Sequence, residues 1–321
     1  MARVSEFDLI ARYFAPLACS PDKLVLTSTG DDCAVIMPPA NTAVCFSIDT
    51  MVEGVHFPPG APPFDLAYRS LAAALSDLAS MGASPAFFTL ALTLPDAQPE
   101  WLENFSAGLR VLVERYKFPL LGGDTTRGPL TVSIQVHGFL TKPALLRSGA
   151  QVGDIVAVSG TLGDAGAALD LLSSAVAGGE GLSANESYLL SRYYQPSPRI
   201  DLGQYLSGLA TSCIDISDGL LAEAEHLSSK SSVRISIDSS SIPLSPQLIA
   251  FKGLETAKNL ALNAGDDYEL LFTIPERQWL DVLSALPEKS ITRIGSVTEG
   301  SGVELDGMNS KKLRKGFQHF E

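Results

Sequence analysis

The sequence predicts a two-domain protein of α/β class (α+β in each domain), in which helices and strands alternate along both halves of the chain. The chain has 321 residues, which is more than one typical domain holds. Its hydrophobic share of 45% is enough to fill two cores. Residues 147–154 read Arg-Ser-Gly-Ala-Gln-Val-Gly-Asp, a composition typical of a hinge. This hinge predicts one domain over residues 1–148 and a second over residues 149–321.

Hydrophobic periodicity predicts the elements of the first half. Apolar residues at helical spacing indicate helices, and alternating β-formers indicate strands. A leucine stripe marks the longest helix, which Gly82 and Pro85 end. In the strand over 43–49, Phe46 and Ile48 are expected to point into the core. The expected elements are a helix over 5–14 with Ser5 as N-cap, strands over 33–37 and 43–49, a helix over 64–80, a strand over 87–94, a helix over 100–116 and a strand over 130–140.

The second half continues the same series. The glycine pattern Gly160-x-x-Gly163-x-x-Gly166 follows a buried strand and opens a helix. Its spacing does not fit a dinucleotide-binding fingerprint and favours close helix packing. The expected elements are a strand over 155–158, the helix after Gly160, a surface loop over 173–185, a helix after Pro198, and strands over 212–216 and 268–274.

Charge excludes several classes of partner. There are 23 Lys and Arg against 36 Asp and Glu, so the formal net charge is −13. Such a chain repels nucleic acid and anionic membranes. No apolar run approaches the roughly 18 residues of a membrane span, and the acidic N-terminus does not resemble a signal peptide. The four cysteines form no Cys-x-x-Cys pair. We therefore expect a cytoplasmic protein with neither a nucleic-acid nor a membrane partner.

Some of the acidic side chains stand in positions that suit a cation. Ser47 and Asp49 share one face of their strand, and paired oxygen ligands on one face suit a hard cation. Asp77 lies inside the apolar helix over 64–80, beside small side chains that leave space for a ligand. An Asp on the solvated surface of a helix is an equally good reading of Asp77.

Further aspartates stand at strand ends in the second half. Asp215 and Ser217 share a strand face, and Asp218-Gly219 can cap a helix that begins at Leu220. Taken singly, each aspartate has such a local explanation, because Asp favours turns and caps. Many converging carboxylates without cations would repel one another, so their convergence implies Mg²⁺ or Mn²⁺ and, with it, a phosphate-bearing substrate.

The usual phosphate-binding loops are missing from the sequence. Gly122 and Gly123 precede Asp124, and because glycine has no side chain, their backbone can approach a triphosphate closely. Arg127 and Arg147 are candidate cations for phosphate oxygens. No motif indicates a covalent nucleophile. Among the four histidines, His56 is the one placed to meet a substrate, just beyond the strand over 43–49.

Taken in order, these motifs resemble the thiamine-monophosphate kinase family. The family belongs to the superfamily of aminoimidazole ribonucleotide synthetase and selenophosphate synthetase. The resemblance covers essentially the whole chain and is specific as an ordered set. Its motifs are Gly30-Asp-Asp-Cys-Ala, Ser47-Ile-Asp-Thr, His56-Phe, Leu75-Ser-Asp-Leu-Ala-Ser-Met-Gly-Ala, Gly122-Gly-Asp-Thr-Thr-Arg-Gly, Arg147-Ser-Gly-Ala, Ile214-Asp-Ile-Ser-Asp-Gly, Asp267-Tyr-Glu-Leu and Lys315-Gly-Phe-Gln-His-Phe.

The resemblance implies a fold and an activity. The N-terminal domain would bind ATP and magnesium and contribute its sheet to a barrel across a homodimer. The C-terminal α+β domain would complete the active site. The reaction would be ATP-dependent phosphorylation of thiamine monophosphate to thiamine diphosphate, the last step in making that cofactor, by direct in-line transfer assisted by several Mg²⁺ ions and without a phosphoenzyme.

The resemblance also implies roles for individual residues. The metal ligands would be Asp31, Asp32, Ser47, Ile48, Asp49, Asp77, Asp124, Asp215 and Asp218, of which Asp77, Asp49 and Asp124 are central to metal positioning. Gly123, Arg147 and Ser217 would contact ATP, and His56, Asp266 and Phe317 would contact thiamine monophosphate.

Two positions depart from the family pattern. Ile48 stands where many relatives carry a hydroxyl residue, so a metal contact there would use its backbone carbonyl. Asp266 replaces the usual Glu and reaches one methylene less far. Phe317 keeps the aromatic character that can pack against cationic thiamine rings.

Three other classes compete with this interpretation. Selenophosphate synthetase uses a reactive Cys and a Lys near its N-terminus, where this chain has Cys19 and Lys23 without the matching motif. A metal-dependent phosphatase or phosphodiesterase also uses clustered aspartates. A cation-binding protein without activity would bind Mg²⁺ and turn over no ATP.

Overall fold

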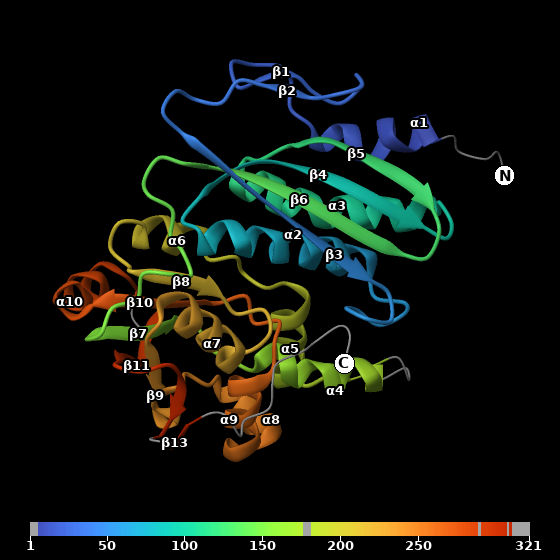
Figure 1. Ribbon diagram of the computed structural model, residues 1–321. Helices are drawn as coiled ribbons and strands as arrows, with labels where there is room; N and C mark the ends of the chain where they lie inside the picture. The colour runs from blue at the N-terminus through green and yellow to red at the C-terminus, as the bar shows by residue number, and fades with distance from the viewer. Residues whose placement is uncertain (1–5, 176–180, 288–289, 307, 310–321) are drawn as a thin grey trace. The chain divides into compact units, whose positions relative to one another are not determined.

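The computed structural model describes residues 6–175, 181–287, 290–306 and 308–309. The chain divides into two compact units (Figure 1). The first comprises residues 1–78 and 83–141, and the second comprises residues 79–82 and 142–321. The proposed N-cap Ser5 and the proposed substrate contact Phe317 lie outside the described residues.

The first unit is built on a four-stranded sheet with the order β3-β6-β4-β5. Neighbouring strands are antiparallel except β4 and β5, which are parallel. Val132, Ile134 and Val136 of β6 are all buried, as their alternation predicts. The strands are β3 (Ala43–Val52), β4 (Ser84–Leu94), β5 (Leu120–Arg127) and β6 (Thr131–Leu140).

Two 18-residue helices, α2 (Pro63–Ser80) and α3 (Pro99–Tyr116), cover one face of this sheet (Figure 1). Both begin at a proline, which suits the first turn of a helix because its missing N–H has no partner to lose there. The leucines of α2 are at most 1% exposed. The hydroxyl of Ser70 on α2 lies 3.4 Å from the sulfur of Met51 on β3, so α2 packs against the odd-numbered side of β3.

The expected inward direction of Phe46 and Ile48 is wrong. Phe46 is 67% and Ile48 is 63% exposed, while Ser47 and Asp49 are partly buried. The alternation itself is correct, but the polar side of β3 faces α2. An apolar side chain in a strand is usually the buried one, and here a polar partner on the helix reverses that rule.

The N-terminal segment of the first unit is less regular than expected. The helix over 5–14 consists of one α-helical segment, α1 (Glu6–Leu9), which continues as a π-helix over Ile10–Phe14 and a 3-10 turn over Ala15–Leu17. The strand over 33–37 shrinks to β2 (Val35–Ile36), which pairs with β1 (Val25–Thr27) in an antiparallel ladder.

The second unit is built on a seven-stranded sheet with the order β13-β12-β9-β11-β7-β10-β8. Its ladders are antiparallel apart from the parallel pair β9 and β12. Every residue of β7 and β8 is buried. The strands are β7 (Asp154–Ser159), β8 (Ser212–Asp215), β9 (Arg234–Ile237), β10 (Leu270–Pro275), β11 (Ile291–Thr298), β12 (Gly302–Leu305) and β13 (Met308–Asn309).

Helices accompany this sheet, and the glycine pattern after β7 packs one of them closely. A Cβ at Gly163, where φ is +85°, would lie 2.6 Å from the backbone nitrogen of Ala261. The pattern therefore serves helix packing, as its spacing predicts. The helices are α4 (Asp164–Ala175), α5 (Ala184–Tyr194), α6 (Ile200–Leu206), α7 (Leu220–Ser231), α8 (Pro246–Lys252), α9 (Leu254–Asn263) and α10 (Glu276–Ala285). The loop expected over 173–185 is thus shortened from both sides by α4 and α5.

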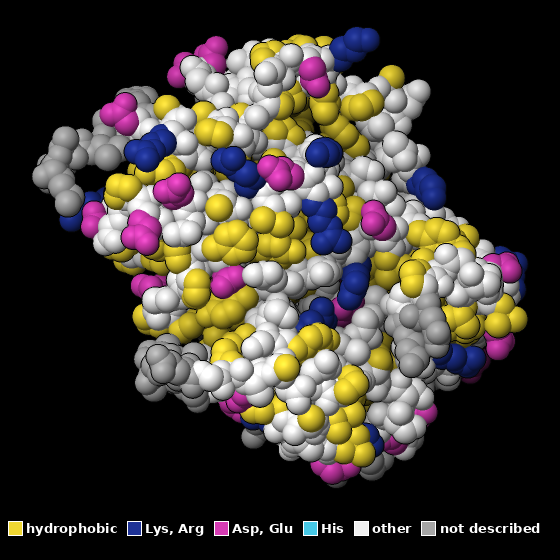
Figure 2. Space-filling view, turned by 180° about the vertical axis from the view of Figure 1, so that it is seen from behind, with side chains coloured by type: hydrophobic (Ala, Val, Ile, Leu, Met, Phe, Trp, Pro, Cys, Tyr) yellow, Lys and Arg dark blue, Asp and Glu magenta, His cyan; other side chains and the backbone are white. Residues whose placement is uncertain are grey.

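The described helices include none with the length and apolar character needed to cross a bilayer. On the face shown in Figure 2, Lys and Arg side chains are interspersed with Asp and Glu. The coloured side chains there form no broad region of one charge, so the acidic excess is not displayed as one acidic patch on this face.

Candidate active site

An oxygen cluster joins β3 to α2 in the first unit. The hydroxyl of Ser47 donates a 2.5 Å hydrogen bond to Oδ2 of Asp77. Asp49 lies two residues further along the same side of β3, opposite Ile134 of β6. The structure therefore turns Asp77 toward the sheet.

The donor set of this cluster fits a hard divalent cation. Burial, together with the negative charge of Asp77, raises the pKa of Asp49 to about 7. Two crowded carboxylates repel each other when both are ionised, and a divalent cation between such groups favours the ionised form. Carboxylate and hydroxyl oxygens are also the ligands that Mg²⁺ prefers.

A second group of aspartates lines a pocket of about 460 Å³ in the first unit. Asp31 and Asp32 approach it from the segment after β1, and Asp124 approaches it from β5. Phe14 and Leu90 contribute apolar walls. Oδ1 of Asp31 accepts a 2.9 Å hydrogen bond from the backbone N–H of Asp32, so Asp31 also orders the segment that carries Asp32.

Gly123 is required by strand pairing. It lies opposite Leu90 where β4 and β5 run parallel. A Cβ at Gly123 would lie 2.0 Å from the carbonyl oxygen of Leu90. A Cβ at Gly122 would meet nothing within 4 Å, so Gly122 is the glycine that leaves open space beside Asp124.

The strand register separates two of the predicted metal ligands. Asp124 pairs with Ala91, and Ala91 with Ser133, which in turn pairs with Thr50. Paired residues share a sheet face, so Asp124 lies on the face of Thr50 and away from the face of Asp49. Across the described ranges, no three His, Cys, Asp or Glu side chains gather into a group that would hold a metal.

His56 follows β3 and has a defined tautomer. Its Nδ1 accepts a 3.0 Å hydrogen bond from the backbone N–H of Val52. An imidazole that accepts at Nδ1 carries its proton on Nε2. His56 can therefore act as a donor through Nε2 toward a phosphate oxygen.

In the second unit, Asp215 ends β8 and is buried, and Ser217 and Asp218 follow it. Glu223 of α7 accepts hydrogen bonds from the Ser217 hydroxyl (3.3 Å) and from the Asp218 backbone N–H (3.1 Å). Of the expected cap Asp218-Gly219, Gly219 is the N-cap of α7, which begins at Leu220, and the cap has no side-chain hydrogen bond. Glu223 therefore holds this bend through its two hydrogen bonds. Its position as an acidic residue in the first turn of α7 was the feature of the sequence that could have identified it.

Arg147 is exposed and lies near this bend. Burial raises the pKa of Glu223, while the charges of His226 and Arg147 act in the opposite direction. The carbonyl of Arg147 accepts a 3.3 Å hydrogen bond from Ser231. Arg147 and Ser217, the predicted ATP contacts of this unit, thus share Glu223 as a neighbour.

Asp266 stands beside Ser217. Its backbone N–H donates a 2.8 Å hydrogen bond to the Ser217 carbonyl. Its φ of +69° lies in the left-handed region, which a residue other than glycine adopts at a cost. The structure therefore brings together the predicted ATP contact Ser217 and the predicted substrate contact Asp266.

Two regions of the chain match models of AIR synthase related proteins. Residues 30–140 match the N-terminal domain and residues 151–307 match the C-terminal domain. Together with the two sheets and the aspartates they carry, these matches define a two-domain protein of the AIR synthase related class.

Similar proteins narrow this class. The chain is 44% identical to the thiamine-monophosphate kinase of Escherichia coli (strain K12), over 98% of both chains. A crystal structure of thiamine-monophosphate kinase from Stenotrophomonas maltophilia is 40% identical, with a TM-score of 0.85 over 95% of this chain and 98% of that one. A structure described as AaThiL complexed with AMPPCP and TMP is 32% identical, with a TM-score of 0.80 over 100% and 99% of the two chains. The chain belongs to the thiamine-monophosphate kinase family.

Proposed function

We propose that this protein transfers the γ-phosphoryl group of ATP to thiamine monophosphate and forms thiamine diphosphate. The observation that carries the proposal is the 44% identity with a thiamine-monophosphate kinase over 98% of both chains. A relative 32% identical to the chain has been described with AMPPCP, an ATP analogue, and TMP. The proposed substrates follow from these two relatives.

The proposed magnesium ligands are spread over both units. Ser47, Asp49, Asp77 and the backbone carbonyl of Ile48 come from β3 and α2, with Asp77, Asp49 and Asp124 central to metal positioning. When bound, Mg²⁺ would neutralise the repulsion between two phosphate-bearing substrates and align them for in-line transfer. Crowding of Asp49 by Asp77 supports this assignment. The remaining ligands in the proposal are Asp31, Asp32, Asp215 and Asp218.

Residues of both units would bind and orient the two substrates. Gly123, Arg147 and Ser217 are assigned to ATP, with the cationic Arg147 suited to phosphate oxygens. His56 is assigned to the acceptor phosphate through its Nε2–H, and Asp266 and Phe317 to the cationic thiamine. The attacking phosphate oxygen is already ionised near neutral pH, so the reaction needs no general base. Direct transfer without a phosphoenzyme is part of the proposal through the family resemblance.

We also propose a homodimer in which the first-unit sheets of two copies form a barrel. The outward side of β3 presents Val44, Phe46 and Ile48, which are 41%, 67% and 63% exposed. Adjacent apolar side chains on an open sheet face are typical of a protein–protein interface. A second copy of the same sheet would cover them.

We propose that the protein is located in the cytoplasm. The described cysteines Cys19, Cys33, Cys45 and Cys213 are free thiols, which is usual in a reducing compartment. Burial raises the pKa of Cys19, and the charge of Asp22 raises it further. A thiol held in this state is a poor nucleophile, which disfavours the reactive-cysteine chemistry of selenophosphate synthetase.

The test is an ADP-release assay with thiamine monophosphate, thiamine and aminoimidazole precursors as alternative acceptors. We expect ADP and thiamine diphosphate only with thiamine monophosphate, and only with Mg²⁺ present. Turnover with another acceptor alone would assign a different member of the superfamily. If the protein binds Mg²⁺ but releases no ADP from ATP with any of these acceptors, it is a cation-binding protein without this activity, and the proposal is overturned.

A further inference from the structure

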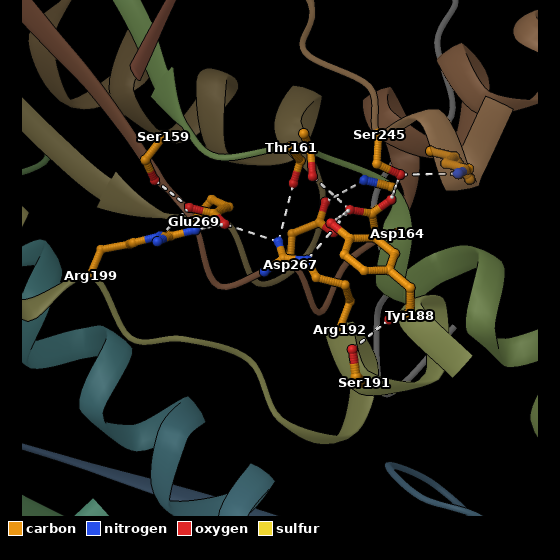
Figure 3. A network of polar contacts seen from close by, with 12 residues as sticks. Ser159, Thr161, Asp164, Tyr188, Ser191, Arg192, Arg199, Ser245, Asp267 and Glu269 are labelled. Atoms are coloured by element: carbon orange, nitrogen blue, oxygen red, sulfur yellow. Dashed lines mark hydrogen bonds and ion pairs between the residues drawn. The ribbon is translucent and has the colours of Figure 1, made fainter. Parts of the chain in front are cut away.

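A network of polar contacts in the second unit joins several charged side chains (Figure 3). None of these charged residues is assigned to a metal or a substrate. The network contains the carboxyl groups of Asp164, Asp267 and Glu269, which are 0%, 2% and 0% exposed. The guanidinium groups of Arg192 and Arg199 face them. We call these five residues the ion cluster. Burying so many ionisable groups is costly unless they are paired, so their arrangement calls for a physical explanation.

Glu269 is the centre of the ion cluster. Its carboxylate accepts hydrogen bonds from Ser159 (2.5 Å), from Nη2 of Arg192 (2.9 Å) and from Nε of Arg199 (2.6 Å). Burial alone would raise the pKa of Glu269, but the hydrogen bond and charge of Arg199, followed by the charge of Arg192, leave it below its ordinary value. Glu269 is therefore an ionised anchor between two guanidinium groups.

The other acidic groups of the ion cluster fasten further segments. Asp164 opens α4 and accepts from Ser245 (2.5 Å) and Thr161 (2.6 Å), with Nε of Arg192 at 3.4 Å. Asp267 accepts a 2.7 Å hydrogen bond from the backbone N–H of Gly163. Burial raises the pKa of Asp267 well above its ordinary value, against the effect of that hydrogen bond.

The backbone between α9 and β10 connects the ion cluster to the candidate active site. Asp266 and Tyr268 have φ values of +69° and +50°, so two residues other than glycine adopt the left-handed region on either side of Asp267. The N–H of Asp266 donates to the Ser217 carbonyl at 2.8 Å, and that of Tyr268 donates to the Ile216 carbonyl at 2.9 Å. The buried Asp267 and Glu269 thus alternate with residues that face the end of β8.

Such a conformation persists only where its surroundings enforce it. Glu269 supplies that constraint through its hydrogen bonds with Arg199 and Arg192. Asp267 supplies it through its hydrogen bond with the backbone of Gly163. Ser217 has a further support, since its hydroxyl also bonds Glu223. The backbone of Asp266 depends on the constraint more directly than Ser217 does.

We propose that Arg199 and Glu269 are positioning residues, which hold the turn over 264–268 so that Asp266 meets the thiamine monophosphate. This proposal rests on the proposed function, in which Asp266 contacts that substrate. Neither residue touches a reactant. Their effect is transmitted through the backbone between Glu269 and Asp266.

The test compares Arg199→Met and Arg199→Lys with the control Arg234→Met. Arg234 on β9 forms a 3.2 Å ion pair with Glu304 on β12. The control therefore also removes an arginine ion pair of the second unit, but one outside the ion cluster. We expect Arg199→Met to raise the KM for thiamine monophosphate about tenfold, because small misplacements of binding groups are costly. The KM for ATP should change less than about twofold, since Ser217 keeps its bond to Glu223. Arg199→Lys should recover part of the loss, and the control should leave both KM values unchanged.

Equal rises in both KM values, or a lower melting temperature with both KM values unchanged, would overturn the positioning role. Should Arg199→Met fail to fold, Ser159→Ala removes one bond to Glu269 without removing a charge and should give a smaller shift in the same direction. Wild-type protein that forms no thiamine diphosphate would instead overturn the proposed function. Amide hydrogen exchange of residues 264–268 tests the positioning role independently of the proposed function. The exchange should accelerate in Arg199→Met but not in Arg234→Met. Unchanged exchange in Arg199→Met would refute the role of the ion cluster.

Discussion

Ser47 on β3 donates a 2.5 Å hydrogen bond to Asp77 on α2, which fixes a carboxylate from the middle of an apolar helix against the sheet. The same relationship explains why β3 turns its polar side inward. It also places Asp77 near Asp49, whose pKa is raised by burial and additionally by the charge of Asp77.

We expect Asp77→Ala to leave the fold intact and to lower kcat/KM at least about hundredfold, because it removes a proposed central metal ligand. The ADP-release assay measures the change, and thermal unfolding checks the fold. Glu103→Ala is the matched control, since Glu103 is an exposed carboxylate on α3 of the same unit. Near-normal Mg²⁺-dependent activity in Asp77→Ala would contradict the assignment.

Asp49→Asn should separate stability from metal binding. Without metal and above pH 7, the variant should melt about 3 °C higher than wild type, because burial and the charge of Asp77 both disfavour the ionised carboxylate of Asp49 and an amide carries no charge. Added Mg²⁺ should raise the melting temperature of the wild type, since a ligand that binds only the folded state stabilises it. The variant should respond much less. An equal Mg²⁺ response in both proteins would argue against a cation at this cluster.

Gly123 and Gly122 offer a matched pair of substitutions. Gly123→Ala should lower the free energy of unfolding by about 2 kcal/mol, because the new Cβ overlaps the Leu90 carbonyl and pushes β5 away from β4. Gly122→Ala should cost less than about 1 kcal/mol, as its Cβ meets open space. Urea unfolding measures both. A larger loss in Gly122→Ala would show that the β4–β5 contact does not require a glycine at 123.

Asp267→Asn should change the pH dependence of stability. Burial raises the pKa of Asp267 above its ordinary value of 3.8, so between these two values the folded state holds a proton that the unfolded state has lost. This contribution to stability is complete below the ordinary value and is lost as pH rises through the raised value. The melting temperature of Asp267→Asn minus that of wild type should therefore increase with pH. A difference that stays constant across pH would mean that Asp267 does not titrate in this way.

Phe46→Glu should convert the proposed dimer to a monomer, because it places a charge within the apolar outer side of β3. Sedimentation velocity at micromolar concentration measures the change. Val111→Glu is the control, since Val111 is 42% exposed on α3 in the same unit, and it should leave the dimer intact. A monomeric wild type, or a Phe46→Glu variant that still sediments as a dimer, would contradict the proposed barrel.

Local patterns predicted much of the fold. The leucine stripe placed α2 within one residue of its observed start, and the alternation of Val132, Ile134 and Val136 identified the buried side of β6. The direction of β3 was wrong, because alternation defines two faces without telling which one meets a helix. The Ser47–Asp77 bond that decides it joins two residues that are 30 positions apart.

The candidate site was predictable in composition more than in arrangement. Local sequence context drew attention to Asp49, Asp77 and Asp124, but only the strand register shows that Asp49 and Asp124 occupy opposite sheet faces. The ion cluster was not anticipated at all. Ser159 and Glu269 are 110 residues apart, so their bond leaves no local signal in the sequence.

The most direct test of the central claim follows the label from γ-³²P-ATP with thiamine monophosphate and Mg²⁺. We predict that the label appears in the terminal phosphate of thiamine diphosphate, with none on the protein and no product without ATP. Release of phosphate from thiamine monophosphate in the absence of ATP would identify a phosphatase. That result, or label found on any other acceptor in place of thiamine monophosphate, would contradict the account.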